Sequence, residues 1–173
     1  VEQDYPMMIQ APNITSSIGQ SSPDQCDDNT ITVTISVDVV LYPTCLPTIT
    51  LTGLTGYATS DPSLTVPFTV SGVSGITDKT ATWDQGNGTI VVAIFDGEAN
   101  TVNIPASTDV EFQFILTNPS TAQESPTTFL SVAFQDEPTG QSNYVSSFHA
   151  VTIYDSSAVQ VPGADTTAVI QTG

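Results

Sequence analysis

Residues 83–89, WDQGNGT, contain side chains that could bind a ligand. An indole ring can form a platform for a sugar, and Asp84 carries oxygens of the kind that calcium prefers. The same residues also fit a hairpin bend, because strand-like runs flank them and the two glycines and Asn87 tolerate positive φ. We favour the bend, with Trp83 in the core at the end of its strand. The sugar platform and the calcium site stay open, although the loop supplies only one carboxylate.

A catalytic centre is difficult to assemble from the remaining residues. The chain has one histidine, His149, which lies in the alternating run SFHAVTIY. There is no Gly-x-Ser-x-Gly sequence for a serine nucleophile and no glycine-rich phosphate loop. One histidine and two cysteines fall short of the three or four ligands of a zinc site. We therefore expect a protein that is not an enzyme and has no resident metal.

Composition and charge exclude several classes of partner. The 173 residues favour one domain, and the 18 acidic residues face a single basic one, Lys79, for a formal net charge of −17. Proteins that bind nucleic acid or anionic membranes need Lys and Arg to neutralise phosphates. No apolar run approaches the 18 residues of a membrane-spanning helix. We expect neither nucleic-acid binding nor membrane insertion.

Two cysteines and two sequons indicate an extracellular or cell-surface protein. Cys26 and Cys45 would form a disulfide in a secreted chain. This disulfide would close a loop of about 20 residues and stabilise the folded state by roughly 3 kcal/mol. Asn13 and Asn87 each begin an Asn-x-Ser/Thr triplet, so both are candidate sites for covalent glycans. Few lysines and many serines and threonines are consistent with that location.

Alternating apolar and polar residues predict strands, and no segment has a sustained helical period. The run ITVTISVDVV, residues 31–40, alternates. One face holds Val33, Ile35, Val37 and Val39, and the other holds Thr32, Thr34, Ser36 and Asp38. Pro67 within residues 64–70 predicts an edge strand or a bulge. The other predicted strands are residues 48–54, 79–83, 89–95, 102–104, 110–116, 128–134 and 147–154.

Short strands separated by turn residues predict an all-β, immunoglobulin-like Greek-key sandwich. We assign the sandwich to residues 29–154. Residues 1–28 show little alternation, and residues 155–173 hold short apolar pairs around Pro162-Gly163. Both ends are predicted to be extended arms outside the compact body.

Acidic loops are candidate weak calcium sites. Asp24, Asp27 and Asp28 lie beside Cys26, and Asp136 with Glu137 forms a smaller group. Either group could bind Ca²⁺ weakly from a calcium-rich medium, and both also fit solvated loop charge that aids solubility. We expect no cofactor beyond this.

Several phrases resemble repeat units of very large secreted or surface proteins of microalgae and other protists. They are TITLTGLTG, TATWDQGNGTIVVAIFDGEAN and VNIPASTDVEFQFILTNPSTAQESPTTFLSVA, within residues 29–135. The resemblance implies an Ig-like β-domain of a cell-surface coat, a flagellar hair (mastigoneme) or a similar extracellular fibre. It carries over no catalytic residue.

The leading hypothesis is a structural subunit of an extracellular filament or cell-surface coat. Copies would join head-to-tail into a homopolymer, with an arm of one copy added as a strand to a neighbour. The side chains expected to fill pockets on the neighbour are Val159, Val161, Ala168 and Ile170. The alternative is a carbohydrate-binding or calcium-dependent adhesion module that uses Trp83, Tyr57, Tyr144 and the acidic loops.

Overall fold

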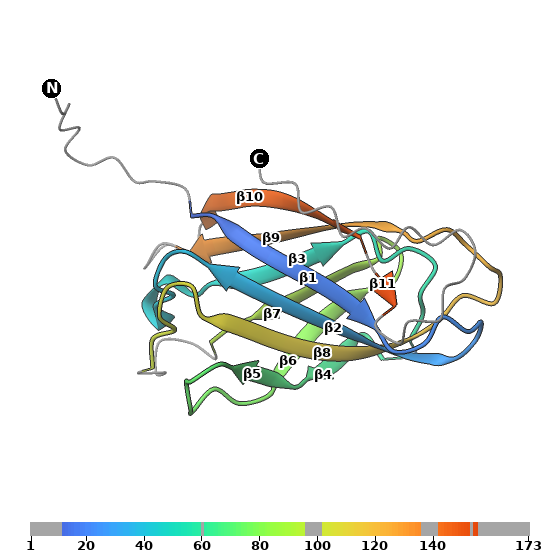
Figure 1. Ribbon diagram of the computed structural model, residues 1–173, viewed down its shortest axis with the longest axis horizontal. Coiled ribbons are helices and arrows are strands. Elements are labelled where there is room, and N and C mark those ends of the chain that lie inside the picture. The colour runs from blue at the N-terminus through green and yellow to red at the C-terminus, as the bar shows by residue number, and fades with distance from the viewer. Residues whose placement is uncertain (1–11, 60, 96–101, 136–141, 153, 156–173) are drawn as a thin grey trace, which may run out of the picture.

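A computed structural model describes residues 12–59, 61–95, 102–135, 142–152 and 154–155. These residues form a sandwich of two β-sheets (Figure 1). The predicted all-β, immunoglobulin-like fold is therefore confirmed. The strands are β1 (Ile14–Gln20), β2 (Asp28–Val37), β3 (Thr48–Thr52), β4 (Ser63–Val66), β5 (Phe68–Val70), β6 (Lys79–Asp84), β7 (Thr89–Ala93), β8 (Asp109–Thr117), β9 (Thr127–Gln135), β10 (Ser142–Thr152) and β11 (Tyr154–Asp155). A short 3₁₀ helix, η1, covers Pro43–Cys45.

One sheet has the strand order β11-β1-β2-β8-β5, and the other has the order β10-β9-β3-β7-β6-β4. Neighbouring strands are antiparallel except for β1 and β11, which pair in parallel at Gly19–Tyr154 and Gln20–Asp155. Each sheet therefore contains strands that are distant in sequence. This arrangement is what distinguishes a Greek-key sandwich from a simple meander.

The core lies between the two sheets and follows the alternation in the sequence. In β2, Ile31, Val33 and Ile35 are fully buried, and the threonines between them face outward. Fully burying a side chain of this size contributes about 1.5–3 kcal/mol. Phe68 and Phe112 stack with ring centroids 5.3 Å apart, which fixes the short strand β5 against β8.

The first strand of the sandwich lies in the segment that was predicted to be an arm. Residues 14–20 form β1 and pair with β2 along their whole length. Ile14 and Ile18 are fully buried, because they enter the core between the sheets. The predicted arm of residues 1–28 is wrong for this part, and residues 1–11 lie outside the described part of the chain.

Pro67 marks the point where the chain changes sheet. Strand β4 belongs to the six-stranded sheet and β5 to the five-stranded sheet, with Pro67 between them. Proline has no N–H to donate, so it interrupts a ladder of backbone hydrogen bonds. Alternate residues from Leu64 to Val70 nevertheless all face the core. The predicted edge position of this segment is confirmed.

Candidate functional site

Residues 83–89 form the hairpin bend between β6 and β7. Trp83 pairs with Ile90 and Asp84 with Thr89, which leaves residues 85–88 in the loop. Gly88 has a φ of +60°, and a Cβ there would lie 2.6 Å from the carbonyl carbon of Leu54. The hairpin prediction is confirmed, and glycine is required at position 88 both for its φ and for the close approach.

Trp83 is a core residue and cannot serve as a sugar platform. Its side chain is 4% exposed. Its indole N–H is buried, and no described residue accepts a hydrogen bond from it. The predicted burial of Trp83 is confirmed, whereas the aromatic site of the carbohydrate alternative loses its main member.

Tyr57 is also withdrawn from the surface. It is 6% exposed, and its hydroxyl group lies 3.4 Å from Oε1 of Gln20, to which it donates. Burial raises the pKa of the Tyr57 hydroxyl. The predicted platform of Trp83, Tyr57 and Tyr144 is therefore wrong for its first two residues. The side chains of Tyr144 and His149 lie outside the described part.

The Asp84 carboxylate is engaged within its own turn. It accepts hydrogen bonds from Nδ2 of Asn87 at 2.6 Å and from the Asn87 backbone N–H at 3.2 Å. The side-chain bond is the main reason that the pKa of Asp84 is lowered. Among the described residues, no three His, Cys, Asp or Glu side chains gather in a way that could hold a metal ion. The hairpin therefore offers a cation a single carboxylate, and that carboxylate already accepts two hydrogen bonds.

Both sequon asparagines lie at exposed positions. Asn13 precedes β1, and its Nδ2 donates to the Asp38 carboxylate at 3.1 Å. Asn87 lies at the tip of the β6–β7 hairpin. In each case the residue is exposed, and the nitrogen that would carry a glycan donates a hydrogen bond to a carboxylate. Glycans at these two positions stay a prediction.

The predicted disulfide between Cys26 and Cys45 is wrong: both are free cysteines. Cys26 precedes β2, and its backbone N–H donates a hydrogen bond to the carbonyl of Pro119, which lies beyond the end of β8. Cys45 lies past the other end of β2, in η1. The ten residues of β2 span about 30 Å. A disulfide requires Cα atoms within about 7 Å, so these two thiols cannot meet within one chain.

A buried polar network closes the end of the sandwich at the β1–β2 turn. Nδ2 of Asn118 donates to the carbonyls of Ser22 at 2.9 Å and Asp24 at 2.8 Å. Oδ1 of Asn118 accepts from Nδ2 of Asn29 at 2.8 Å, and Asn29 is fully buried. Oδ1 of Asn29 accepts from the Ser21 and Ser22 backbone N–H groups. The network joins the turn to the end of β8, and sequence reasoning missed it.

The acidic group at this turn is exposed. Asp24, Asp27 and Asp28 are all exposed, and Asp27 accepts a hydrogen bond from the Ser22 hydroxyl. Asp28 accepts from the Thr117 hydroxyl at 3.3 Å. Asn118 donates hydrogen bonds to the backbone carbonyls of Asp24 and Asp27, but the three carboxylates do not converge on one point that could hold a metal ion.

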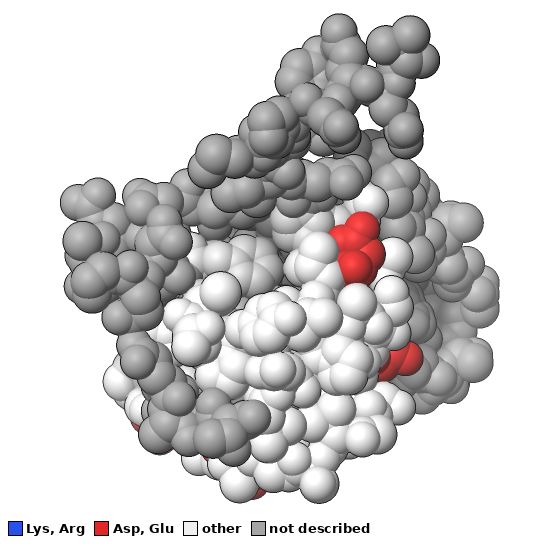
Figure 2. Space-filling model, turned by 90° about the vertical axis from the view of Figure 1, so that its left-hand side faces the viewer, with Lys and Arg blue, Asp and Glu red and all other residues white. Residues whose placement is uncertain are grey.

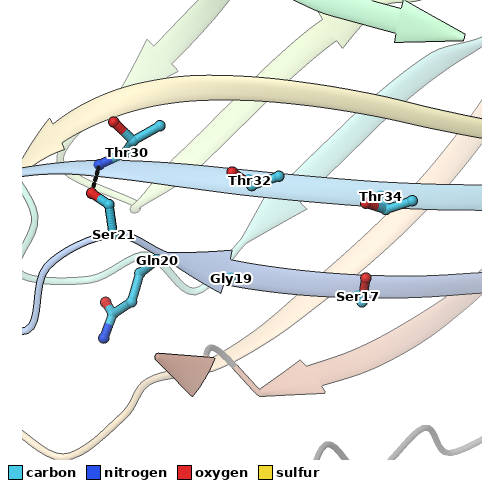
Figure 3. A pocket seen from close by; sticks show the side chains of 7 residues that line it. All are labelled: Ser17, Gly19, Gln20, Ser21, Thr30, Thr32 and Thr34. Atoms are coloured by element: carbon cyan, nitrogen blue, oxygen red, sulfur yellow. Dashed lines mark hydrogen bonds between the residues drawn. The ribbon is translucent and has the colours of Figure 1, made fainter. Parts of the chain in front are cut away.

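A shallow hollow of about 230 Å³ lies on the outer face of β1 and β2 (Figure 3). Gly19 lies opposite Thr32 and, having no side chain, leaves space beside it. Such a surface can hydrogen-bond a neutral polar molecule, but it offers no charge and no aromatic ring to hold one. The lining residues are Ser17, Gly19, Gln20, Ser21, Thr30, Thr32 and Thr34.

The open edge of the sandwich is the best candidate for assembly. Strand β4 pairs with β6 and strand β5 with β8, and no other described strand pairs with either one (Figure 1). Residues 63–70, SLTVPFTV, contain no charged side chain. Unpaired backbone groups at an uncharged edge can accept a strand from another chain. We name residues 63–70 the open edge.

The residues predicted to enter a neighbour lie outside the described part of the chain. They follow β11, whose Asp155 is beside Gln20 at the same end of the sandwich as Cys26. No helix in the described part is long and apolar enough to cross a membrane. The undescribed residues in question are Val159, Val161, Ala168 and Ile170.

No protein-family model and no curated protein match this sequence. The collagen-binding domain of a Staphylococcus aureus adhesin is 12% identical, with a TM-score of 0.47 over 82% of this chain and 96% of that one. A protein that catalyses macrocyclization in alchivemycin A biosynthesis is 13% identical, with a TM-score of 0.45 over 82% and 87%. The pilus backbone protein of Streptococcus pneumoniae is 13% identical, with a TM-score of 0.44 over 75% and 33%.

At these identities and TM-scores the similarities carry no argument about function. One of the three proteins is an adhesin, one an enzyme and one a pilus backbone, and a shared fold does not decide among such functions. They give no support to the resemblance to mastigoneme or other protist surface proteins. Any functional conclusion must come from the surfaces of this chain.

Proposed function

We propose that this chain is a structural subunit of an extracellular filament or cell-surface coat, in which copies join by strand addition. The observation that carries the proposal is the open edge, residues 63–70. Its two strands lie at the edges of their sheets and, apart from the bridge between Val70 and Val73, have no described partner on their outer side. It carries no charged side chain, on a chain whose formal net charge is −17. A partner strand can therefore approach there without meeting a carboxylate on the edge itself.

The charge distribution supports contact at selected places only. The one basic side chain, Lys79, is 3% exposed, so the described surface carries acidic and neutral groups. Two copies repel each other wherever carboxylates face carboxylates, and salt screens this repulsion beyond about 8–10 Å. Uncharged surfaces such as the open edge are where copies can meet at low electrostatic cost.

The length of the C-terminal segment also supports the proposal. The 18 residues after Asp155 could reach about 60 Å if fully extended. Their apolar residues Val159 and Val161, and Ala168 and Ile170, are spaced by two, as a strand requires to place them on one face. A segment of this length could leave one copy and add to the open edge of the next.

Removing residues 156–173 tests the donor, and Thr65→Lys tests the acceptor. Thr65 is an exposed residue of β4, and a lysine on an edge strand opposes strand addition. We expect the truncation to abolish polymers and Thr65→Lys to lower their yield several-fold, as measured by sedimentation and negative-stain imaging. Thr32→Lys is the matched control, because it makes the same charge change on the central strand β2. Unchanged polymers in the truncated chain and in Thr65→Lys would refute strand addition at this edge.

We also propose that the protein is extracellular and carries N-linked glycans at Asn13 and Asn87. Both side chains are exposed, as glycan attachment requires. The carbohydrate-binding alternative is not favoured, because Trp83 and Tyr57 are buried.

A further inference from the structure

The two thiols of this chain lie at opposite ends of the sandwich. Cys26 is exposed in the β1–β2 turn, and Cys45 is partly exposed in η1, past the far end of β2. Figure 1 has the longest axis of the molecule horizontal, and β2 runs along it from the first end to the second. Two cysteines placed in this way cannot bond within a copy, but each can face the other across a contact between copies.

The two ends also differ in charge. The end with Cys26 carries three exposed carboxylates, those of Asp24, Asp27 and Asp28. Residues 39–47 at the other end, VVLYPTCLP, contain no charged side chain. Val39 and Tyr42 there are 36% and 47% exposed. Figure 2 views this end, where acidic groups in red lie among the uncharged described residues in white.

This asymmetry disfavours contact between two Cys26 ends. Two Cys26 ends placed together would bring six carboxylates into one interface, which costs free energy by like-charge repulsion. A Cys26 end against a Cys45 end brings these three carboxylates against the uncharged residues 39–47 and the exposed Tyr42, with the exposed carboxylates of Asp38 and Asp109 nearby. Head-to-tail contact is therefore less repulsive than contact between two Cys26 ends, and repeating it produces a linear polymer.

We propose that Cys26 of one copy and Cys45 of the next form an intermolecular disulfide that links subunits head-to-tail. The inference rests on the proposed filament function, and it supplies a covalent bond that strand addition does not. Because each copy has one thiol at each end, the links can continue without limit. The same two thiols would otherwise be unused, since the structure separates them by the length of β2.

The bond forms by thiol–disulfide exchange with a low-molecular-weight disulfide as the oxidant. The thiolate of Cys26 attacks the small disulfide and forms a mixed disulfide, releasing one small thiolate. The thiolate of Cys45 from the next copy then attacks the Cys26 sulfur and releases the second. Two protein thiols are oxidised, one small disulfide is reduced to two thiols, and the two protons from the cysteines pass to the released thiolates.

The test is to incubate the folded full-length chain with cystamine, a cationic disulfide that the acidic end attracts, and to separate the products by non-reducing electrophoresis. We expect a ladder that extends beyond dimers. Cys26→Ser and Cys45→Ser should each give no ladder, because neither variant can form the Cys26–Cys45 bond. In concentrated urea the wild-type chain should instead form an internal disulfide, because the roughly 20-residue loop is then free to close.

Mixing copies of normal and heavy isotope composition identifies the bond. Peptides that join Cys26 to Cys45 and carry one isotope from each copy would confirm the inference. Wild-type products that stop at dimers, or Cys26–Cys45 peptides from a single copy, would overturn it. Imaging the same chain in reductant separates the two proposals. Filaments in reductant together with no ladder under cystamine would refute the disulfide alone. The absence of both filaments and ladder would refute both proposals.

Discussion

Replacing Trp83 with alanine is expected to lower the free energy of unfolding by about 3–5 kcal/mol, because it empties a large site in the core. The side chain is 4% exposed and lies between the sheets. For a chain of 173 residues this corresponds to a fall in melting temperature of roughly 6–20 °C. Calorimetry or circular dichroism measures the change directly.

Trp83→Phe is the informative companion variant. It also removes volume, but it eliminates the buried indole N–H, which has no acceptor among the described residues and is costly to desolvate. These effects oppose each other, so we expect a net change of less than about 1.5 kcal/mol. A loss as large as that of Trp83→Ala would contradict this expectation, because removing the N–H would then give no gain that offsets the lost volume.

Asn118→Ala is expected to lower the free energy of unfolding by about 2–4 kcal/mol, because several buried polar groups lose a partner at once. The carbonyls of Ser22 and Asp24 each lose a donor, and Nδ2 of Asn29 loses one of its acceptors. The melting temperature should fall by roughly 4–16 °C.

Asn103→Ala is the matched control for this experiment. Asn103 is exposed and lies away from the network, so the same substitution should change the free energy of unfolding by no more than about 0.5 kcal/mol. Equal effects of the two substitutions would mean that the network contributes nothing specific to stability.

Alternation in the sequence predicted the strands that pack between the sheets. Residues 31–40 and 110–116 correspond to the central strands β2 and β8, because a strand with one buried face must alternate apolar and polar residues. The edge position of residues 64–70 was predicted from the missing N–H of Pro67, whereas the change of sheet at this residue was not. The prediction of a lone buried Trp83 beside a hairpin also holds, since both features are local in sequence.

Features that depend on which distant segments meet could not be predicted in this way. Residues 14–20, ITSSIGQ, have only two large apolar residues, and their burial depends on pairing with β2. The expected disulfide failed because loop length says nothing about the rigid strand between the two cysteines. The contact between Asn29 and Asn118 spans 89 residues, and its one sequence signal was the phrase TNP within the surface-protein resemblance.

Sedimentation velocity of the full-length chain over a wide range of concentration tests the central claim most directly. If the chain is a filament subunit, larger species should grow at the expense of the monomer as concentration rises. Moderate salt should increase their share, because it screens the repulsion between copies of net charge −17. A single monomeric species at every concentration and at both low and moderate salt would contradict the account.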